Sequence, residues 1–320
     1  MKRNSLLFSL VFLGVLFALP ARAVTLRYAL KKGTEITYKI QFAEASKRSG
    51  LLALRASETS SITAETVYRI KVLNVLPSGE MELEREILSG KEKTTEDGET
   101  YEVDFLKEKT LFNLSPAGKI TLLRTKKPKE AKPSEEPEEE DTKASKHEPE
   151  SKLPSDMGEL QLDLLTDGTF VPLPEKEVQA GDSWECEIGS EALQIPLPPG
   201  AKAEPSKVKV KSTLTELADY KGRKCAHIKT TFEMAVSTEV SDPQMPIKAS
   251  VNAKIAGLVD WYFDYENART PSATGSMQRL MKITLDIPPE IAAQLPPEAK
   301  ETAQGSGASK GNSKTTLVEK

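Results

Sequence analysis

Apolar and polar residues alternate along much of the chain. Lys207–Leu214 reads KVKVKSTL, which places three of its apolar side chains on one face of an extended strand. The segments Ile247–Ile255 and Met277–Ile287 show the same period of two. A period of two is typical of strands with one buried and one solvated face, as in antiparallel sheets. The pattern therefore predicts an antiparallel β block over residues 156–287.

An earlier block, residues 24–125, carries the same signal. Ile36, Tyr38, Ile40 and Phe42 alternate with polar residues, and further alternating runs follow them. Glycine-containing turn sequences separate the runs in both blocks, as expected for hairpins. These turns are Pro77-Ser78-Gly79, Asp97-Gly98, Pro116-Ala117-Gly118 and Tyr220-Lys221-Gly222.

The two blocks resemble each other. Lys31–Ile40 (KKGTEITYKI) aligns with Gln179–Ile188 (QAGDSWECEI), and each segment has a glycine at its third position. Leu111–Ile120 (LFNLSPAGKI) is similar to Tyr262–Pro271 (YFDYENARTP), with a phenylalanine at the second position of each. Because these features also occur in the same order, the sequence predicts a mainly β protein built from two similar β-meander halves.

Two segments lack the apolar residues that a packed core needs. Residues 126–155 are rich in Glu, Lys and Pro, and we interpret them as a disordered charged linker between the halves. Residues 288–320 contain two Pro-Pro pairs and then a Gly/Ser/Lys-rich stretch. We expect this segment to be a disordered tail.

The beginning of the sequence predicts export. Lys2 and Arg3 precede an apolar run from Leu6 to Leu19, and the small residues Ala21 and Ala23 follow it. This is the pattern of a signal peptide over residues 1–23. The run is shorter than the roughly 20 residues that a membrane span needs, which favours cleavage over a retained transmembrane anchor. We expect a periplasmic or extracellular protein.

Composition excludes several classes of function. The net charge is −4, which argues against a nucleic-acid-binding protein. With two His and two Cys in 320 residues, we expect no metal site and no cofactor. The oligomeric state is left open.

The sequence also offers little for catalysis. His147 lies in the charged linker. His227 alternates with the apolar residues of its strand, so we expect His227 to face water. The nucleophile-elbow, zinc-protease and phosphate-loop motifs are absent from the sequence. Asp260 and Asp264 share a face, but they are weak candidates for a paired-carboxylate site. We therefore predict that the protein is not an enzyme.

The two cysteines, Cys186 and Cys225, raise the question of a disulfide, because exported proteins meet oxidising conditions. Their strands are expected to flank the strand at 207–217, about 9.5 Å apart at twice the usual strand spacing, whereas a bridge needs Cα atoms within about 7 Å. A bulge near Gly222 would bring them closer. Both the bridged and the free states remain open at this point.

Three segments carry a resemblance to a known family. They are the segment Leu173–Trp184 (LPEKEVQAGDSW), the hairpin Asp219–Thr231 (DYKGRKCAHIKTT) and the turn Tyr262–Arg269 (YFDYENAR). They resemble an uncharacterised family of exported bacterial proteins that is similar to the LolA/LolB lipoprotein-carrier and LppX-like superfamily. The resemblance implies a strongly curved antiparallel sheet, an open half-barrel, with short helices that plug its concave side. It also implies a concavity that binds acyl chains or lipidated partners.

The segment Met157–Leu165 fits such a plug, since its leucines recur at helical spacing, although a strand would also fit. Aromatic and methionine side chains on the apolar phase are either core or the lining of a lipid cavity. We predict an exported, non-enzymatic binding protein that holds a lipid, an acyl chain or a lipidated partner. The alternative is a structural or interaction protein of the cell envelope with no small ligand. The candidate ligand-binding residues are Trp184, Trp261, Phe263, Tyr38, Phe42, Met277 and Met281.

Overall fold

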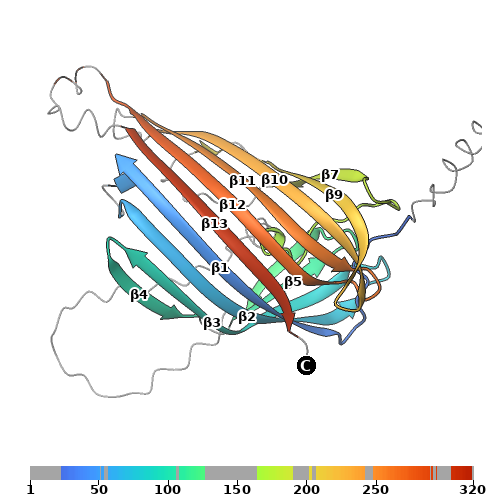
Figure 1. Ribbon diagram of the computed structural model, residues 1–320. Coiled ribbons are helices and arrows are strands. Elements are labelled where there is room, and N and C mark those ends of the chain that lie inside the picture. Colours follow the sequence, from blue (N-terminus) through green and yellow to red (C-terminus); the bar gives the residue numbers. More distant parts are fainter. Residues whose placement is uncertain are drawn as a thin grey trace, which may run out of the picture.

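The protein forms one large antiparallel β-sheet (Figure 1). The computed structural model describes residues 23–50, 52–53, 57–105, 108–126, 164–189, 202–203, 207–241, 248–288, 290, 293 and 304–318. Its strands are β1 (Glu35–Gly50), β2 (Thr59–Val75), β3 (Met81–Glu96), β4 (Glu99–Asp104), β5 (Lys109–Leu114), β6 (Ile120–Lys126), β7 (Ser183–Gly189), β8 (Lys202–Ala203), β9 (Lys207–Tyr220), β10 (Arg223–Ser241), β11 (Lys248–Asp264), β12 (Arg269–Asp286) and β13 (Gln304–Val318).

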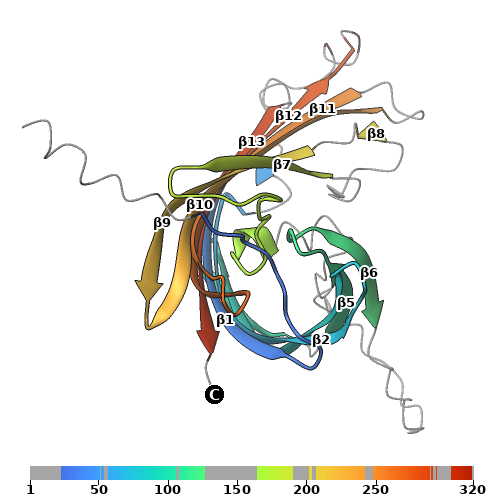
Figure 2. The ribbon, with the colours of Figure 1, turned by 90° about the vertical axis from the view of Figure 1, so that its right-hand side faces the viewer.

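Eleven of these strands form a continuous path across the sheet. Their order is β6, β5, β3, β2, β1, β13, β12, β11, β10, β9 and β7, with β4 beside β3 and β8 beside β10. The described strands do not close into a barrel, because β6 and β7 lie at opposite ends of the path. Figure 2 shows the curvature of the sheet, whose first half wraps round the segment that begins at residue 164. The prediction of a strongly curved, open half-barrel is confirmed.

The two halves of the sheet follow the same plan. In the first half the amide of Gly33 donates to the carbonyl of Val72, at 2.9 Å. In the second half the amide of Gly181 donates to the carbonyl of Leu214, at 2.7 Å. Both glycines have a positive φ (82° and 95°), which explains why glycine stands at the third position of both aligned segments. The similarity in sequence thus corresponds to the same turn before the first strand of each half.

The hairpin turns lie where the sequence predicts them. At Asp97-Gly98, between β3 and β4, both residues have positive φ. The same is true of Lys221-Gly222, between β9 and β10. Two residues with positive φ match the right-handed twist of the strands that they join.

The predicted disordered tail is wrong over residues 304–318. This segment is β13, and it lies between β1 and β12 at the centre of the sheet (Figure 1). The prediction rested on the low apolar content of the segment. Apolar content indicates only how much apolar surface the segment's own side chains can bury. A strand with a neighbour on each side is stabilised instead by two ladders of backbone hydrogen bonds.

The core fills the concave side at one end of the sheet. Leu164 and Leu165 are fully buried there, and residues 164–166 form a helical turn that plugs the curve. Large aromatic side chains from the sheet, from the plug and from the segment before β1 belong to the same core. They are Tyr28, Tyr38, Tyr68, Phe112, Phe170, Trp261 and Phe263.

Burial decreases toward the other end of the long strands. In β1 the side chains of Ile36, Tyr38 and Ile40 are buried, whereas residues 41–50 alternate between exposed and half-buried. The central strands therefore extend beyond the plugged core, and their far ends form a separate surface.

Several expectations fall on residues outside those described. They are the signal peptide except for its last residue, the linker except for Lys126, and residues 157–163 of the predicted plug. Within the described part of the chain, we find no helix of the length and apolar character that a bilayer crossing requires.

Candidate functional site

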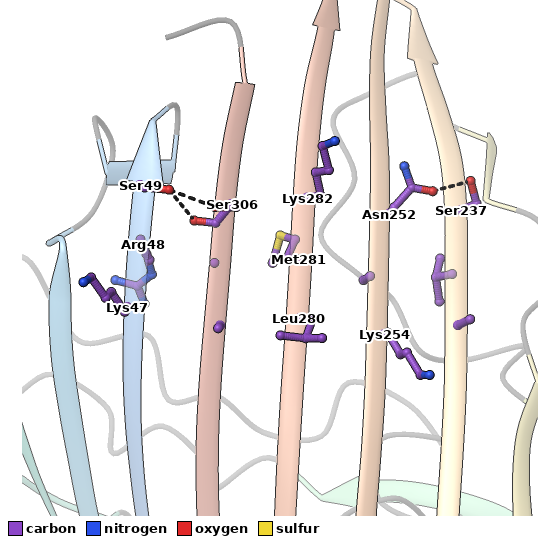
Figure 3. A pocket seen from close by; sticks show the side chains of 15 residues that line it. Lys47, Arg48, Ser49, Ser237, Asn252, Lys254, Leu280, Met281, Lys282 and Ser306 are labelled. Carbon is purple, nitrogen blue, oxygen red and sulfur yellow. Dashed lines mark hydrogen bonds between the residues drawn. The ribbon is translucent and has the colours of Figure 1, made fainter. Parts of the chain in front are cut away.

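A hollow of about 870 Å³ crosses the far ends of the five central strands. Three consecutive residues of each strand line it, namely 47–49 of β1, 306–308 of β13, 280–282 of β12, 252–254 of β11 and 235–237 of β10 (Figure 3). Its volume lies in the range of about 300–1,000 Å³ that is usual for small-molecule sites.

The register of the strands arranges these residues in three rows across the sheet. The middle row faces the same side as the core, and the two flanking rows lie on the opposite face. The middle row is Arg48, Gly307, Met281, Ala253 and Val236. The flanking rows are Lys47, Ala308, Leu280, Lys254 and Ala235, and Ser49, Ser306, Lys282, Asn252 and Ser237.

Leu280 is the apolar centre of the flanking rows. Its side chain is on the face away from the core, where it is 43% exposed. Lys254 is directly opposite Leu280 on β11, and Lys282 is two residues further along β12 on the same face. Ala308 of β13 lies on the other side of Leu280. An exposed leucine between small residues and two lysines forms an amphipathic surface.

All four charged residues that line the hollow are cationic: Lys47, Arg48, Lys254 and Lys282. Arg48 is engaged, since its Nη1 donates to the carbonyl of Ser57 at 3.2 Å. Among the described residues, no ion pair includes any of the three lysines. The hollow thus joins apolar surface to an excess of positive charge, which suits a ligand with an apolar part and an anionic group.

Hydroxyl and amide groups at one edge of the hollow are already paired. Ser49 Oγ and Ser306 Oγ are 2.8 Å apart, which links β1 to β13. Ser237 Oγ donates to Asn252 Oδ1 at 2.9 Å, which links β10 to β11 (Figure 3). These polar contacts link neighbouring strands of the sheet.

Most of the aromatic residues predicted to bind a ligand lie in the core instead. Tyr38, Trp261 and Phe263 are fully buried and pack against other side chains of the protein. The indole Nε1 of Trp261 donates to Thr230 Oγ1 at 3.1 Å, and its ring meets that of Phe263 edge to face at 5.8 Å. These contacts place the three residues in the hydrophobic core.

The other predicted residues are divided among three places. Phe42 and Met277 line a void of about 20 Å³, which is too small for a ligand. Trp184 donates from Nε1 to the carbonyl of Pro172 at 3.0 Å and lines a second hollow, of about 690 Å³, beside β7. Met281 alone among the predicted residues lines the large hollow, and it is 38% exposed.

Sequence reasoning missed Leu280 and the lysines because they are on the polar phase of their strands. The signal that could have identified Leu280 is a large apolar residue at a position where the alternation along its strand places polar residues. Leu258 and Leu280 are such residues, and both are large, exposed hydrophobic side chains in the structure.

His227 lies on the face away from the core, as predicted, but it is well packed. Its Nε2 is 2.6 Å from Asp260 Oδ1, and its Nδ1 is 3.4 Å from Glu216 Oε1. The ring stacks on Tyr262 with a centroid distance of 4.6 Å, and the side chain is 16% exposed. Carboxylates on both nitrogens fix the orientation of the imidazole.

The second carboxylate considered from the sequence, Asp264, has partners of its own. It is buried and accepts hydrogen bonds from Arg223 Nη1 at 3.1 Å and from the amide of Asn267 at 3.0 Å. Asp260 and Asp264 thus hold different neighbours and do not converge on a shared site. Within the described ranges, no group of three or more His, Cys, Asp or Glu could hold a metal ion.

Cys186 and Cys225 are free thiols. β9 lies between their strands, and Cys186 pairs with Val210 of β9 whereas Cys225 pairs with Ala218, further along the same strand. The register shift between β9 and β10 lies between His227 and the next residue and not beside Gly222, and Cys225 remains paired with Ala218. Burial raises the pKa of each thiol from 9.0 to about 11, so both favour the neutral form.

Comparison with known proteins gives no family for the chain. No family model matches it, and no curated protein is similar to it. Among solved structures, it is similar to the crystal structure of Pseudomonas aeruginosa OccK11 (OpdR), with 6% identity over 91% of this chain and 99% of that chain. The TM-score of this match is 0.20, which is too low to support an argument about fold or function.

Proposed function

We propose that the protein is an exported, non-enzymatic binding protein for an amphiphile with an apolar chain and an acidic head group. The ligand binds in the hollow across β1, β13, β12, β11 and β10. The apolar chain contacts Leu280 and the small residues beside it, and the acidic group lies near Lys254 and Lys282. The N-terminal signal sequence supports export.

The observation that carries the proposal is the composition of the hollow. It combines a volume of about 870 Å³ with the exposed Leu280 on the face away from the core, and every charged residue in its lining is cationic. Binding of an amphiphile on this face would remove the Leu280 side chain from water and place an anionic group beside the lysines. The resemblance to lipid-carrier proteins supports the same class of ligand.

The filled core favours a second candidate, a structural or interaction protein of the cell envelope. Tyr38, Trp261 and Phe263 occupy the concave end where a lipid cavity was expected. On this alternative the charged linker contacts a protein partner, so deletion of residues 127–154 should abolish co-purification of that partner.

Native mass spectrometry of residues 24–320 distinguishes the two candidates. The purified protein is measured directly, and it is then measured after addition of palmitate or the neutral monopalmitoylglycerol. We expect a discrete bound mass of lipid size, and stronger retention of palmitate than of the neutral lipid. A clean unliganded mass with no uptake of either lipid would refute the proposal.

Paired variants test the two parts of the hollow separately. Lys254→Ala/Lys282→Ala should weaken palmitate binding by about tenfold, since two partly exposed ion contacts contribute about 1.4 kcal/mol in total. The same variant should leave binding of the neutral lipid nearly unchanged. Lys310→Ala/Lys314→Ala is the matched control, because both lysines are on β13 outside the hollow. An equal loss in both double variants would show that only net charge matters.

A further inference from the structure

Lysine side chains gather on one face of four neighbouring central strands, β1, β13, β12 and β11 (Figure 1). In the far halves of these strands alternate residues point away from the core, and nearly all of them are exposed. They are the odd-numbered residues of 41–49 in β1 and the even-numbered residues of 306–314 in β13, 274–282 in β12 and 252–258 in β11. We call this surface the lysine face. Its five lysines are Lys47, Lys310, Lys314, Lys282 and Lys254.

The lysine face carries no compensating negative charge. No Asp or Glu occupies it within these four described stretches, and among the described residues no ion pair includes any of its five lysines. Acidic residues appear again on the flanking strands, where Glu65 of β2 lies opposite Gln41 and Glu233 of β10 lies opposite Ala256. The whole chain has a net charge of −4, so the lysine face is opposite in sign to the rest of the protein. A surface with this segregation of charge attracts an anionic partner.

Two large apolar side chains lie among the lysines. Leu258 and Leu280 are 41% and 43% exposed on this face. Leu280 is directly opposite Lys254, and Leu258 is directly opposite Ser276 of β12. An anionic bilayer surface suits both kinds of side chain, because acidic head groups attract lysines and the boundary between head groups and acyl chains accepts apolar side chains.

The residue types of the lysine face favour a membrane over a protein as the partner. Protein interfaces are enriched in aromatic residues, Met and Arg, and they are depleted in Lys. In the four described stretches the lysine face has no aromatic residue, Met or Arg, and its other residues are Ala, Ser, Thr, Asn and Gln. Lys310 and Lys314 are four residues apart on β13, which is about 13 Å along a strand. Mobile acidic lipids can gather beside charges that are spread in this way.

We infer that the lysine face docks the protein on an anionic phospholipid surface, with the lysines beside acidic head groups and Leu258 and Leu280 in contact with the interfacial region. The inference goes beyond the proposed binding of an amphiphile and does not depend on it. Lys310 and Lys314 are on the lysine face but do not line the hollow, so the two roles can be tested separately.

Vesicle flotation with residues 24–320, the protein used for the mass measurements, tests the docking. One set of vesicles contains phosphatidylglycerol and phosphatidylcholine in equal parts, and the other contains phosphatidylcholine alone. We expect binding to the mixed vesicles at low salt, little binding to phosphatidylcholine alone, and release by high salt, since salt screens the charges of exposed lysines.

Paired variants test whether the lysine face is the surface that binds. Lys310→Ala/Lys314→Ala should weaken binding to the mixed vesicles by about 25-fold, since each lysine near an anionic surface contributes about fivefold. Lys310→Arg/Lys314→Arg keeps both charges and should keep the binding. Lys31→Ala/Lys32→Ala is the matched control, because these two exposed lysines precede β1 and lie outside the lysine face. Circular dichroism checks that each variant retains the β-sheet.

No binding to the mixed vesicles would overturn the inference, and so would capture of an acidic protein by this face without any binding to vesicles. An equal loss in the two alanine variants would also overturn it, because only the net charge would then matter. The palmitate measurement separates this result from the proposed function. Lys310→Ala/Lys314→Ala should lose vesicle binding and keep palmitate binding, whereas a wild-type chain that binds vesicles but takes up no lipid would refute the proposed function alone.

Discussion

Replacing Trp261 by alanine tests whether this residue belongs to the core or to a ligand cavity. The indole is fully buried, donates a hydrogen bond to Thr230 at 3.1 Å and packs edge to face on Phe263. If these contacts are formed in the protein without ligand, truncation must cost stability rather than binding. Trp261→Ala should therefore lower the free energy of unfolding and leave uptake of palmitate per folded molecule unchanged.

The expected magnitude follows from the area that the side chain buries. A buried aromatic side chain removes about 200 Å² from water, which at about 25 cal/mol per Å² corresponds to about 5 kcal/mol. The alanine methyl group retains part of this, and the cavity left behind adds to the loss, so we expect a destabilisation of about 3–5 kcal/mol. Trp261→Phe keeps an aromatic ring and loses the Nε1 hydrogen bond, and it should cost about 1–2 kcal/mol.

Urea denaturation followed by far-UV circular dichroism measures both variants, with Leu280→Ala as a control. Leu280 is 43% exposed, so its truncation should change the free energy of unfolding by no more than about 0.5 kcal/mol. An unchanged m-value would show that the unfolding transitions are comparable. A loss of less than about 1 kcal/mol for Trp261→Ala would refute the assignment of this residue to the core.

Three further predictions concern polar groups that are buried or partly buried. Tyr68→Phe removes the hydroxyl that lies 2.5 Å from Thr169 Oγ1 and leaves a buried threonine hydroxyl without that partner, so urea denaturation should show a loss of about 1–2 kcal/mol. Asp264→Asn removes a buried carboxylate from Arg223 and should cost about 3 kcal/mol in the same assay, and a change below about 0.5 kcal/mol would contradict the role of this ion pair. Burial raises the pKa of the Cys186 thiol to about 11 and favours its neutral form, while alkylation requires the thiolate. Alkylation of Cys186 in the folded protein should thus keep accelerating from pH 9 to pH 11, whereas in urea the rate should level off near the ordinary pKa of 9.0; identical pH profiles in the two states would contradict this cause.

The regular strands could be predicted from the sequence because alternation is a local property. Lys207–Leu214 buries Val208, Val210 and Leu214, which are the residues that the pattern assigns to one face. The turn at Asp97-Gly98 was also predictable, since positive φ at two successive residues favours these residue types.

β13 could not be predicted in the same way, because its stability comes from its neighbours. Its glycines and serines bury little apolar surface, and only the pairing with β1 and β12 supplies hydrogen bonds on both sides. Pairing between residues as distant as Thr37 and Val318 leaves no local pattern in the sequence.

The candidate site was predicted only in part for a related reason. An aromatic residue on the apolar phase of a strand is consistent with a core or with a cavity, and the difference depends on what lies opposite. For Tyr38 and Trp261 the opposite side is filled by the plug and its neighbours, whereas Met281 lies beyond the plug. The sequence pattern near Leu164 fitted a plug or a strand, and it did not say how far along the sheet a plug would reach.

The central position of β13 has a consequence for the order of folding. Every other described strand emerges from the ribosome before residues 304–318, so the two halves cannot be joined through β13 until synthesis has passed this segment. Contacts over such long sequence separations form slowly, and in the interval β1 and β12 each present an unpaired edge. A nascent or prematurely terminated chain that lacks this one strand therefore exposes two additional unpaired edges in the middle of the sheet. A chain that lacks an outer strand only moves an edge that the open sheet already has.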